Sequence, residues 1–377
     1  MAQSDVRDDE GAGAPAKAFI CGVEGTALTA AERAFLERER PWGLILFARN
    51  IDSPAQVRAL VADFRAAVGR PLAPVFIDQE GGRVRRLRPP HWQDWPPAGA
   101  LAALFARDPL LALEAARLVT WAMGRELMDL GINADCLPVL DVPQPGSHEI
   151  IGDRAYGRDA AQVALLARAA LAGLNAAGVA GVIKHIPGHG RAGADSHLAL
   201  PVVEAPLADL ERVDFLPFAA LADVPMAMTA HVVYAAIDNG RPATLSEAVI
   251  EGVIRRRMGF DGLLMTDDLN MKALSGSLEE RTRAALTAGC DVVLHCSGRL
   301  DEMEEVAAAT PVLEGKARAR AAMVEAHLAA LPVRTWDGER AETLRCMLME
   351  IAAGSPTTDP TADGRAAEQA ADLPPSS

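Results

Sequence analysis

The sequence predicts an α/β protein that folds as a single (β/α)8 TIM-type barrel. Short apolar runs bounded by Gly, Pro or Asp alternate with segments rich in Ala, Leu and Arg that have a helical period. Eight such runs occur, which is the number of strands in this barrel. Nearly every run ends in a polar side chain. A barrel gathers the carboxyl ends of its strands at one mouth, whereas an open doubly wound sheet does not bring all of them together.

The order of the elements follows from this alternation. Each expected strand is a short apolar run, and each expected helix is a longer segment with apolar residues three and four positions apart. Strands are expected at 18–23, 43–47, 74–78, 132–140, 179–185, 226–231, 262–267 and 290–295. Helices are expected at 29–39, 54–67, 109–129, 160–177, 207–221, 246–257 and 278–288. The polar residues at the strand ends are Arg49, Asn50, Asp78, Glu80, Asp135, Asp141, Lys184, His185, His231, Asp267, Asp268 and His295.

Both ends of the chain depart from this pattern. Residues 1–16 are mostly small or charged, and residues 353–377 have almost no apolar side chains to bury. We therefore expect one folded barrel domain over 17–352, with a disordered segment on either side of it.

Charge and composition limit the class of partner. The net charge is -14, from 37 basic and 51 acidic residues, and no dense Lys or Arg run occurs. This balance disfavours nucleic acid and anionic membranes and favours a small-molecule substrate. The sequence has no evident apolar stretch of the roughly 18 residues that a membrane span needs, and no signal-peptide pattern. Five scattered cysteines without a CxxC pair argue against disulfides and a zinc ribbon. We expect a cytoplasmic monomer.

Two acids follow the apolar run in LLMTDDLNMKAL, residues 263–274. Asp267 comes first after the run, so we expect it to face the barrel mouth. Asp268 is expected to cap or orient the next helix, where a carboxylate can accept backbone N–H bonds. The alternative is that both acids are caps.

Two loops at strand ends combine acids with arginines. FIDQEGGRVRRLR, residues 76–88, passes from Asp78 through Glu80 and two glycines into four arginines. The glycines permit a tight turn that returns a guanidinium to the mouth, where an arginine and an aspartate could clamp sugar hydroxyls or hold an anion. Because arginines this dense are usually partly solvated, we expect one or two inside. In IIGDRAYGRD, an internal pair between Asp153 and Arg154 explains the residues about as well as a functional role.

The stretch IKHIPGHGRAGADSH, residues 183–197, has three histidines at the end of the fifth expected strand. His185, His189 and His197 could bind zinc, but the Pro and Gly residues after His185 break any helix and exclude a helical i, i+4 pair. A plain turn would leave the histidines unexplained. Alternatively, Asp195 orients His197 and favours its protonated form, which gives a general acid near neutral pH. With a strand-end carboxylate, this dyad has the groups that retaining glycoside cleavage needs.

Five segments occur in order between about residues 20 and 300: GLILFARNI, IDQEGGRVRRL, IGDRAYG, KHIPGHGRAGADSH and GFDGLLMTDDLNMKAL. Together they resemble the signature segments of glycoside hydrolase family 3, specifically its bacterial β-N-acetylglucosaminidases of cell-wall recycling. The histidine segment is the most specific of the five. The smallest members of this family are single barrels of this length, and the chain has no room for the second α/β domain of the family's β-glucosidases.

This resemblance implies a role for individual residues. Asp267 would be the nucleophile that forms a covalent glycosyl-enzyme, and His197, paired with Asp195, would be the acid/base on a mobile loop. Contacts to hydroxyls of a terminal N-acetylglucosamine would come from Asp78, Arg86, Arg154, Lys184 and His185.

The implied substrate is a muropeptide in which N-acetylglucosamine is β-1,4-linked to 1,6-anhydro-N-acetylmuramic acid, and neither a metal nor an organic cofactor is implied. Three alternatives stay open. A phosphorylase could use the same dyad with phosphate as the acceptor. A sugar-binding protein could keep the site without turnover, and a metallohydrolase would lose activity in a chelator.

Overall fold

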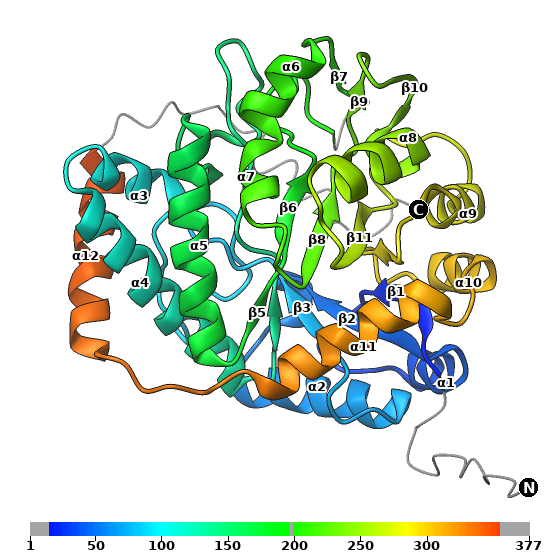
Figure 1. Ribbon diagram of the computed structural model, residues 1–377. Helices are drawn as coiled ribbons and strands as arrows, with labels where there is room; N and C mark the ends of the chain where they lie inside the picture. Colours follow the sequence, from blue (N-terminus) through cyan, green and yellow to red (C-terminus); the bar gives the residue numbers. More distant parts are fainter. Residues whose placement is uncertain (1–14, 197–198, 355–377) are drawn as a thin grey trace, which may run out of the picture.

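The computed structural model describes residues 15–196 and 199–354. Within these residues, nine strand segments pair in parallel to form one curved sheet with helices around it (Figure 1). The segments occur in the order β5-β4-β3-β2-β1-β12-β11-β8-β6. Their bounds are Lys17–Cys21 (β1), Pro41–Leu46 (β2), Val75–Ile77 (β3), Ala134–Asp135 (β4), Ala180–Gly181 (β5), Ile183–Ile186 (β6), Met226–Thr229 (β8), Leu263–Asp268 (β11) and Val292–His295 (β12).

The sheet closes into a barrel because its two edge segments are one piece of chain. β5 pairs with β4 and ends at Gly181, while β6 pairs with β8 and begins at Ile183. Only Val182 separates them, and its N–H donates to the carbonyl of Asp135 at 2.9 Å. With β5 and β6 counted as one strand, the described residues contain eight barrel strands, each within or overlapping a predicted range. The predicted (β/α)8 barrel is confirmed.

Helices follow the strands and cover the outside of the barrel (Figure 1). Thr29 and Glu32 form a capping box at the start of α1, and Ser277 and Glu280 form one at the start of α9. α2 stops at Gly69, whose φ of 65° suits a left-handed C-cap. The bounds are Ala30–Glu39 (α1), Pro54–Val68 (α2), Ala98–Phe105 (α3), Pro109–Asp129 (α4), Ala160–Ala177 (α5), Leu207–Asp209 (α6), Leu216–Ala220 (α7), Glu247–Val249 (α8), Leu278–Ala288 (α9), Leu300–Ala309 (α10), Gly315–Ala330 (α11) and Gly338–Gly354 (α12).

Side chains along each strand alternate between two hydrophobic layers, as the pleat of a strand requires. Ile20 and Met265 belong to the cluster inside the barrel, and their neighbours Phe19 and Leu264 belong to the layer between strands and helices. Val324 of α11 also joins the inner cluster. The inner layer fills the barrel, which leaves its polar chemistry to the strand ends.

Three predicted elements are shorter or broken. The strand expected at 132–140 has regular pairing only over β4, because Pro138 has no backbone N–H to donate to the ladder. The helices expected at 207–221 and 246–257 each contain a segment with i, i+5 bonds, such as Phe215 N–H to the carbonyl of Leu210 at 2.8 Å. These π-helical segments are Leu210–Asp214 and Ile250–Arg257.

Other features of the fold were not predicted. A separate three-stranded sheet pairs β7 (Val202–Val203), β9 (Val233–Tyr234) and β10 (Asp238–Pro242). α12 continues through Gly354, beyond the expected end of the folded domain, and Ala16 at the other end is buried. The rest of the two segments predicted to be disordered lies outside the described residues.

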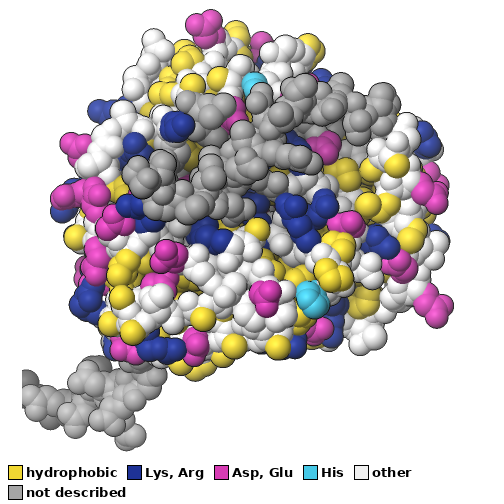
Figure 2. Space-filling view, turned by 180° about the vertical axis from the view of Figure 1, so that it is seen from behind, with side chains coloured by type: hydrophobic (Ala, Val, Ile, Leu, Met, Phe, Trp, Pro, Cys, Tyr) yellow, Lys and Arg dark blue, Asp and Glu magenta, His cyan; other side chains and the backbone are white. Residues whose placement is uncertain are grey.

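Helix α5, in the outer layer, corrects one expectation from the sequence. Among the described residues, α5 has the length and composition of a membrane span, although the sequence was expected to contain no such stretch. This helix is 56% buried and packs against α4 in the helical layer. On the face shown in Figure 2, acidic and basic side chains are interspersed with one another.

Candidate active site

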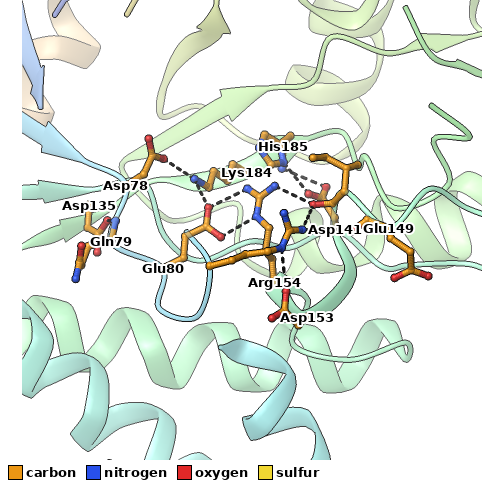
Figure 3. A network of polar contacts seen from close by, with 12 residues as sticks. Asp78, Gln79, Glu80, Asp135, Asp141, Glu149, Asp153, Arg154, Lys184 and His185 are labelled. Atoms are coloured by element: carbon orange, nitrogen blue, oxygen red, sulfur yellow. Dashed lines mark hydrogen bonds and ion pairs between the residues drawn. The ribbon is translucent and has the colours of Figure 1, made fainter. Parts of the chain in front are cut away.

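Strands far apart in the sequence bring their polar residues together at the carboxyl end of the barrel. Asp78 directly follows β3, Lys184 and His185 lie in β6, and Arg154 lies in the loop between β4 and α5. Figure 3 shows these four side chains close to one another, with Glu80 beside them. With Arg86, whose Nη2 lies 3.3 Å from Asp78 Oδ2, the structure groups all five side chains that the resemblance had implied for sugar binding.

Lys184 and Arg154 share the two carboxylates of this group. The ammonium of Lys184 lies 2.7 Å from Asp78 Oδ1 and 2.6 Å from Glu80 Oε1. Arg154 donates from Nε and Nη2 to the two oxygens of Glu80, at 2.8 Å each (Figure 3). The internal pair between Asp153 and Arg154, considered from the sequence, is not formed, since Asp153 pairs with an arginine outside this group.

These charges are held in their ionised forms by each other. Burial alone would raise the pKa of Glu80, but Arg154 and Lys184 lower it to about 2. The same balance places the pKa of Asp78 below its usual range and that of Lys184 above it. A buried set of this kind is strongly destabilised when one partner is lost, because the other charge then stays desolvated and unpaired.

A tight turn returns Arg86 to Asp78. Gly81 and Gly82 have φ values of 93° and 57°, and a Cβ on Gly81 would overlap a backbone carbonyl. The side-chain oxygen of Gln79 accepts the N–H of Arg86 at 2.9 Å, and Arg86 Nη2 lies 3.3 Å from Asp78 Oδ2. The turn predicted from the two glycines is therefore present.

The other arginines of this loop point elsewhere. Arg83 pairs with Asp153 at 3.2 Å, and Arg85 pairs with Asp94 at 3.1 Å. Arg88 is exposed. The expectation that one or two of the four arginines would lie inside is confirmed, and the structure identifies Arg86 as the one beside Asp78.

Asp141 anchors two of the three histidines. Its Oδ2 lies 2.7 Å from His185 Nδ1, and its Oδ1 accepts the backbone N–H groups of His185 at 3.2 Å and His189 at 2.6 Å. Burial would raise the pKa of Asp141, but the neighbouring histidines and these N–H groups lower it. His185 is thus held in one orientation, with its Nδ1 engaged on Asp141.

Asp267 lies near the carboxyl end of β11 and is half-buried. Leu263 and Met265 belong to the inner cluster, and the register of β11 against β12 shifts between Met265 and Asp268. The charge of Asp267 reaches the interior: burial raises the pKa of Cys136 and lowers that of His231, and the Asp267 carboxylate shifts both upward. This position agrees with the expectation that Asp267 faces the mouth.

Asp268, the second acid, forms hydrogen bonds with the backbone. Its Oδ1 accepts the backbone N–H groups of Asn270 and Cys296, each at 3.1 Å, and its own N–H donates to Asp267 Oδ1 at 2.8 Å. Asp268 therefore orients the backbone around Asp267. The expectation that it would cap or orient the next helix is wrong, because Ser277 caps α9.

The loop after β6 carries Asp195. Asp195 and Ser196 are buried, and the Asp195 carbonyl accepts the N–H of Ala199 at 3.0 Å. The hydroxyl of Ser196 lies 3.1 Å from His189 Nε2. His197 lies outside the described residues, so the Asp195–His197 dyad stays a prediction.

The zinc alternative also depends on His197. The rings of His185 and His189 lie 5.7 Å apart, and Asp141 occupies Nδ1 of His185. Across residues 15–196 and 199–354, no group of three His, Cys, Asp or Glu side chains is arranged to hold a metal ion.

Two residues of the site were not assigned a role from the sequence. Glu80 and Asp141 were recognised only as strand-end acids, and their partners lie 74 and 44 positions away along the chain. Their place after predicted strands was the available signal. The role of Gln79, whose side chain holds the turn, had no signal in the sequence.

Comparison with known proteins identifies the family. A family model described as the glycosyl hydrolase family 3 N terminal domain matches residues 19–328. A β-hexosaminidase of Alkalilimnicola ehrlichii is 44% identical over 283 residues, which cover 74% of this chain and 80% of that protein. The crystal structure of NagZ from Neisseria gonorrhoeae in complex with N-trifluoroacetyl-D-glucosamine has a TM-score of 0.77 and 30% identity, and the match covers 90% of this chain and 98% of that one. A family 3 β-N-acetylglucosaminidase from Paenibacillus sp. str. FPU-7 has a TM-score of 0.71 and 32% identity, over 94% of this chain and 66% of that one. The chain therefore belongs to glycosyl hydrolase family 3 and is a glycoside hydrolase of the β-hexosaminidase group.

Proposed function

We propose that the protein is a retaining exo-β-N-acetylglucosaminidase that removes terminal N-acetylglucosamine from peptidoglycan fragments. One observation supports this most directly: Asp267 lies near the carboxyl end of barrel strand β11, and the carboxyl ends of neighbouring strands carry the ordered polar group of Asp78, Lys184 and Arg154. A carboxylate beside hydroxyl-binding groups suits a nucleophile at an anomeric carbon. The names of the relatives, and the N-acetylglucosamine analogue in the gonococcal structure, favour the same sugar.

The proposed reaction is a double displacement. Asp267 attacks the anomeric carbon while protonated His197 gives its proton to the leaving oxygen, so the glycosidic bond breaks as the glycosyl-enzyme forms. Neutral His197 then takes a proton from water, which attacks the anomeric carbon and releases Asp267. Asp195 would orient the imidazole and favour its protonated form in the first step.

The sugar contacts proposed from the resemblance fit the polarity of the site. Carboxylate Asp78 can accept hydrogen bonds from sugar hydroxyls, and the cations Arg86, Arg154 and Lys184 can donate to them. His185 can also donate or accept with Nε2, because its Nδ1 is engaged on Asp141. We propose these side chains as the binding site for terminal N-acetylglucosamine.

We further propose a muropeptide substrate, with 1,6-anhydro-N-acetylmuramic acid as the leaving sugar, and a cytoplasmic, monomeric enzyme that needs no metal or organic cofactor. The acidic net charge supports a small-molecule substrate over nucleic acid or an anionic membrane. Release of N-acetylglucosamine from such a fragment, with no release from internal residues of long glycan chains, is the expected activity.

The first test measures release of 4-nitrophenol from its β-N-acetylglucosaminide in phosphate-free buffer. Wild type should be active, and Asp267→Ala should lose at least about a thousandfold in rate because the nucleophile is gone. His197→Ala should also lose rate. Asp223→Ala is the matched control, since that carboxylate is 70% exposed and pairs with Arg168 on the surface.

Three other outcomes of this test would contradict the proposal, each in a different way. Near-normal turnover by Asp267→Ala would refute its assignment as nucleophile. Activity that appears only with added phosphate would indicate a phosphorylase. Tight binding of N-acetylglucosamine without turnover in any buffer would indicate a sugar-binding protein.

A further inference from the structure

Glu80 lies behind the side chains proposed to contact the sugar. Its side chain is 5% exposed, against 3% for Lys184, 10% for Arg154, 13% for Arg86 and 15% for Asp78. Figure 3 shows its carboxylate beside Lys184 and Arg154, with dashed lines to both. Glu80 is thus less exposed than Arg154, Arg86 and Asp78, and it is buried together with Lys184.

Both oxygens of Glu80 are used by cations. Oε1 lies 2.6 Å from Lys184 Nζ and 2.8 Å from Arg154 Nη2, and Oε2 lies 2.8 Å from Arg154 Nε. A bidentate pair sets the plane of a guanidinium as well as its distance, and the shared oxygen sets the ammonium relative to it. Glu80 therefore confines two long side chains that would otherwise sample many rotamers.

Glu80 also offsets the positive charge of Lys184 and Arg154 at a buried site. Lys184, Arg154 and Arg86 are cations of this group, and Asp78 and Glu80 are carboxylates that pair with them. Burial raises the pKa of nearby Asp135 well above its usual range, which favours its neutral form. Without Glu80, Lys184 and Arg154 would lose the carboxylate that they share, and a desolvated group with one negative charge fewer attracts anions more strongly.

We propose that Glu80 is a positioning and specificity residue, which orients Arg154 and Lys184 toward neutral sugar hydroxyls and keeps anions out of the mouth. This inference rests on the proposed function, because it treats those two cations as sugar contacts. It assigns no step of bond breaking to Glu80, whose role is exerted through the cations.

The test compares Glu80→Gln and Glu80→Asp with wild type. Gln has the same shape without the charge, so KM for 4-nitrophenyl β-N-acetylglucosaminide should rise about tenfold or more, while kcat changes by less than about fivefold. Sulfate at constant ionic strength should inhibit this variant competitively and leave wild type unaffected. Asp keeps the charge with a shorter reach, so its KM should rise without sulfate inhibition.

A surface pair provides the control. Glu114 forms a bidentate pair with Arg340, both at 3.0 Å, far less buried than the pair in the mouth. Glu114→Gln should change neither KM nor the response to sulfate. Unlike phosphate, sulfate is not a glycosyl acceptor in a phosphorylase reaction, so its effect reports on anion binding.

The proposal is overturned if folded Glu80→Gln keeps the wild-type KM, or if it loses only kcat and gains no sulfate inhibition. If Glu80→Gln does not fold, an unchanged KM in Glu80→Asp overturns the positioning role by itself. Inactive wild type would refute the proposed function instead. In that case the thermal shift that sulfate causes in Glu80→Gln, and not in wild type, still tests the exclusion of anions.

Discussion

The imidazole of His185 is held by Asp141, whose Oδ2 lies 2.7 Å from the ring Nδ1 and whose Oδ1 accepts the backbone N–H of the same residue at 3.2 Å. The two residues are 44 positions apart, and Asp141 is fully buried. Asp141 thereby selects which nitrogen of His185 is left for a ligand.

Replacement of Asp141 by Asn should weaken catalysis through His185. The amide removes a charge-assisted hydrogen bond worth about 1.5–3 kcal/mol, so kcat/KM should fall roughly 10- to 100-fold. Steady-state kinetics on the 4-nitrophenyl substrate measure this, with circular dichroism to confirm folding. Asp223→Asn, on the surface, should have no effect. A folded Asp141→Asn enzyme with wild-type kcat/KM would show that the orientation of His185 is unimportant.

His189 should make stability depend on pH. Burial lowers its pKa from 6.5 to about 4. Between these values the unfolded chain binds a proton that the folded protein excludes, so folding stability falls as the pH is lowered through this range. Asp214, whose pKa burial raises to about 6, has the opposite slope but is present in both proteins compared below.

From pH 7.5 to pH 5, wild type should lose about 2 kcal/mol more unfolding free energy than His189→Gln. Urea unfolding at the two pH values measures the difference. Gln can still form a hydrogen bond to Ser196, which limits other changes at the site. Equal losses in the two proteins would mean that His189 titrates normally.

Retention of configuration follows from the proposed nucleophile. If Asp267 forms a covalent glycosyl-enzyme, two inversions at the anomeric carbon release β-N-acetylglucosamine first. Proton NMR recorded within the first minutes of hydrolysis distinguishes this from the α-anomer, which should appear later by mutarotation. Initial formation of the α-anomer would indicate that water attacks directly.

Deletion of residues 355–377 and deletion of α12 should have different effects. Removing residues 355–377 should leave activity unchanged, in line with the tail predicted from the sequence. Removing α12 as well should destabilise the barrel, because Leu344 and Leu348 are buried and Arg345 donates to a backbone carbonyl at 2.8 Å. The loss should be on the order of 3 kcal/mol, seen as a lower midpoint in thermal unfolding. A large loss of activity on the shorter deletion would show that the tail contributes to the site.

Chelation should not affect the enzyme. The proposed mechanism uses a carboxylate and a histidine and requires no Lewis acid. Overnight dialysis against EDTA, followed by assay with and without added zinc, is the measurement. Activity that disappears with EDTA and returns with zinc would support the metallohydrolase that the three histidines left open.

Much of the barrel could be predicted because its signals are local. Alternating apolar residues define a strand, and capping residues such as Thr29 and Ser277 mark the start of a helix within four positions. The breaks were harder to predict. Pro138 interrupts the fourth strand, and the helical period of the sequence did not reveal the π-helical turns before Phe215.

The site also has features that could be predicted from the sequence and features that could not. Asp78, Lys184 and Asp267 could be placed at the mouth from their positions at strand ends. The partner of Arg154 could not, since the nearest acid in sequence is Asp153 and the acid it binds is Glu80.

By itself, the sequence determined the barrel, the family signature and the strand ends that face the mouth, because these depend on residue order over short distances. The tertiary structure decided the pairing of charges: which arginine returns to Asp78, which acid holds Arg154 and Lys184, and which carboxylate orients His185. Those pairs depend on how separate loops are brought together when the sheet closes, and a desolvated charge must find its partner there to be stable.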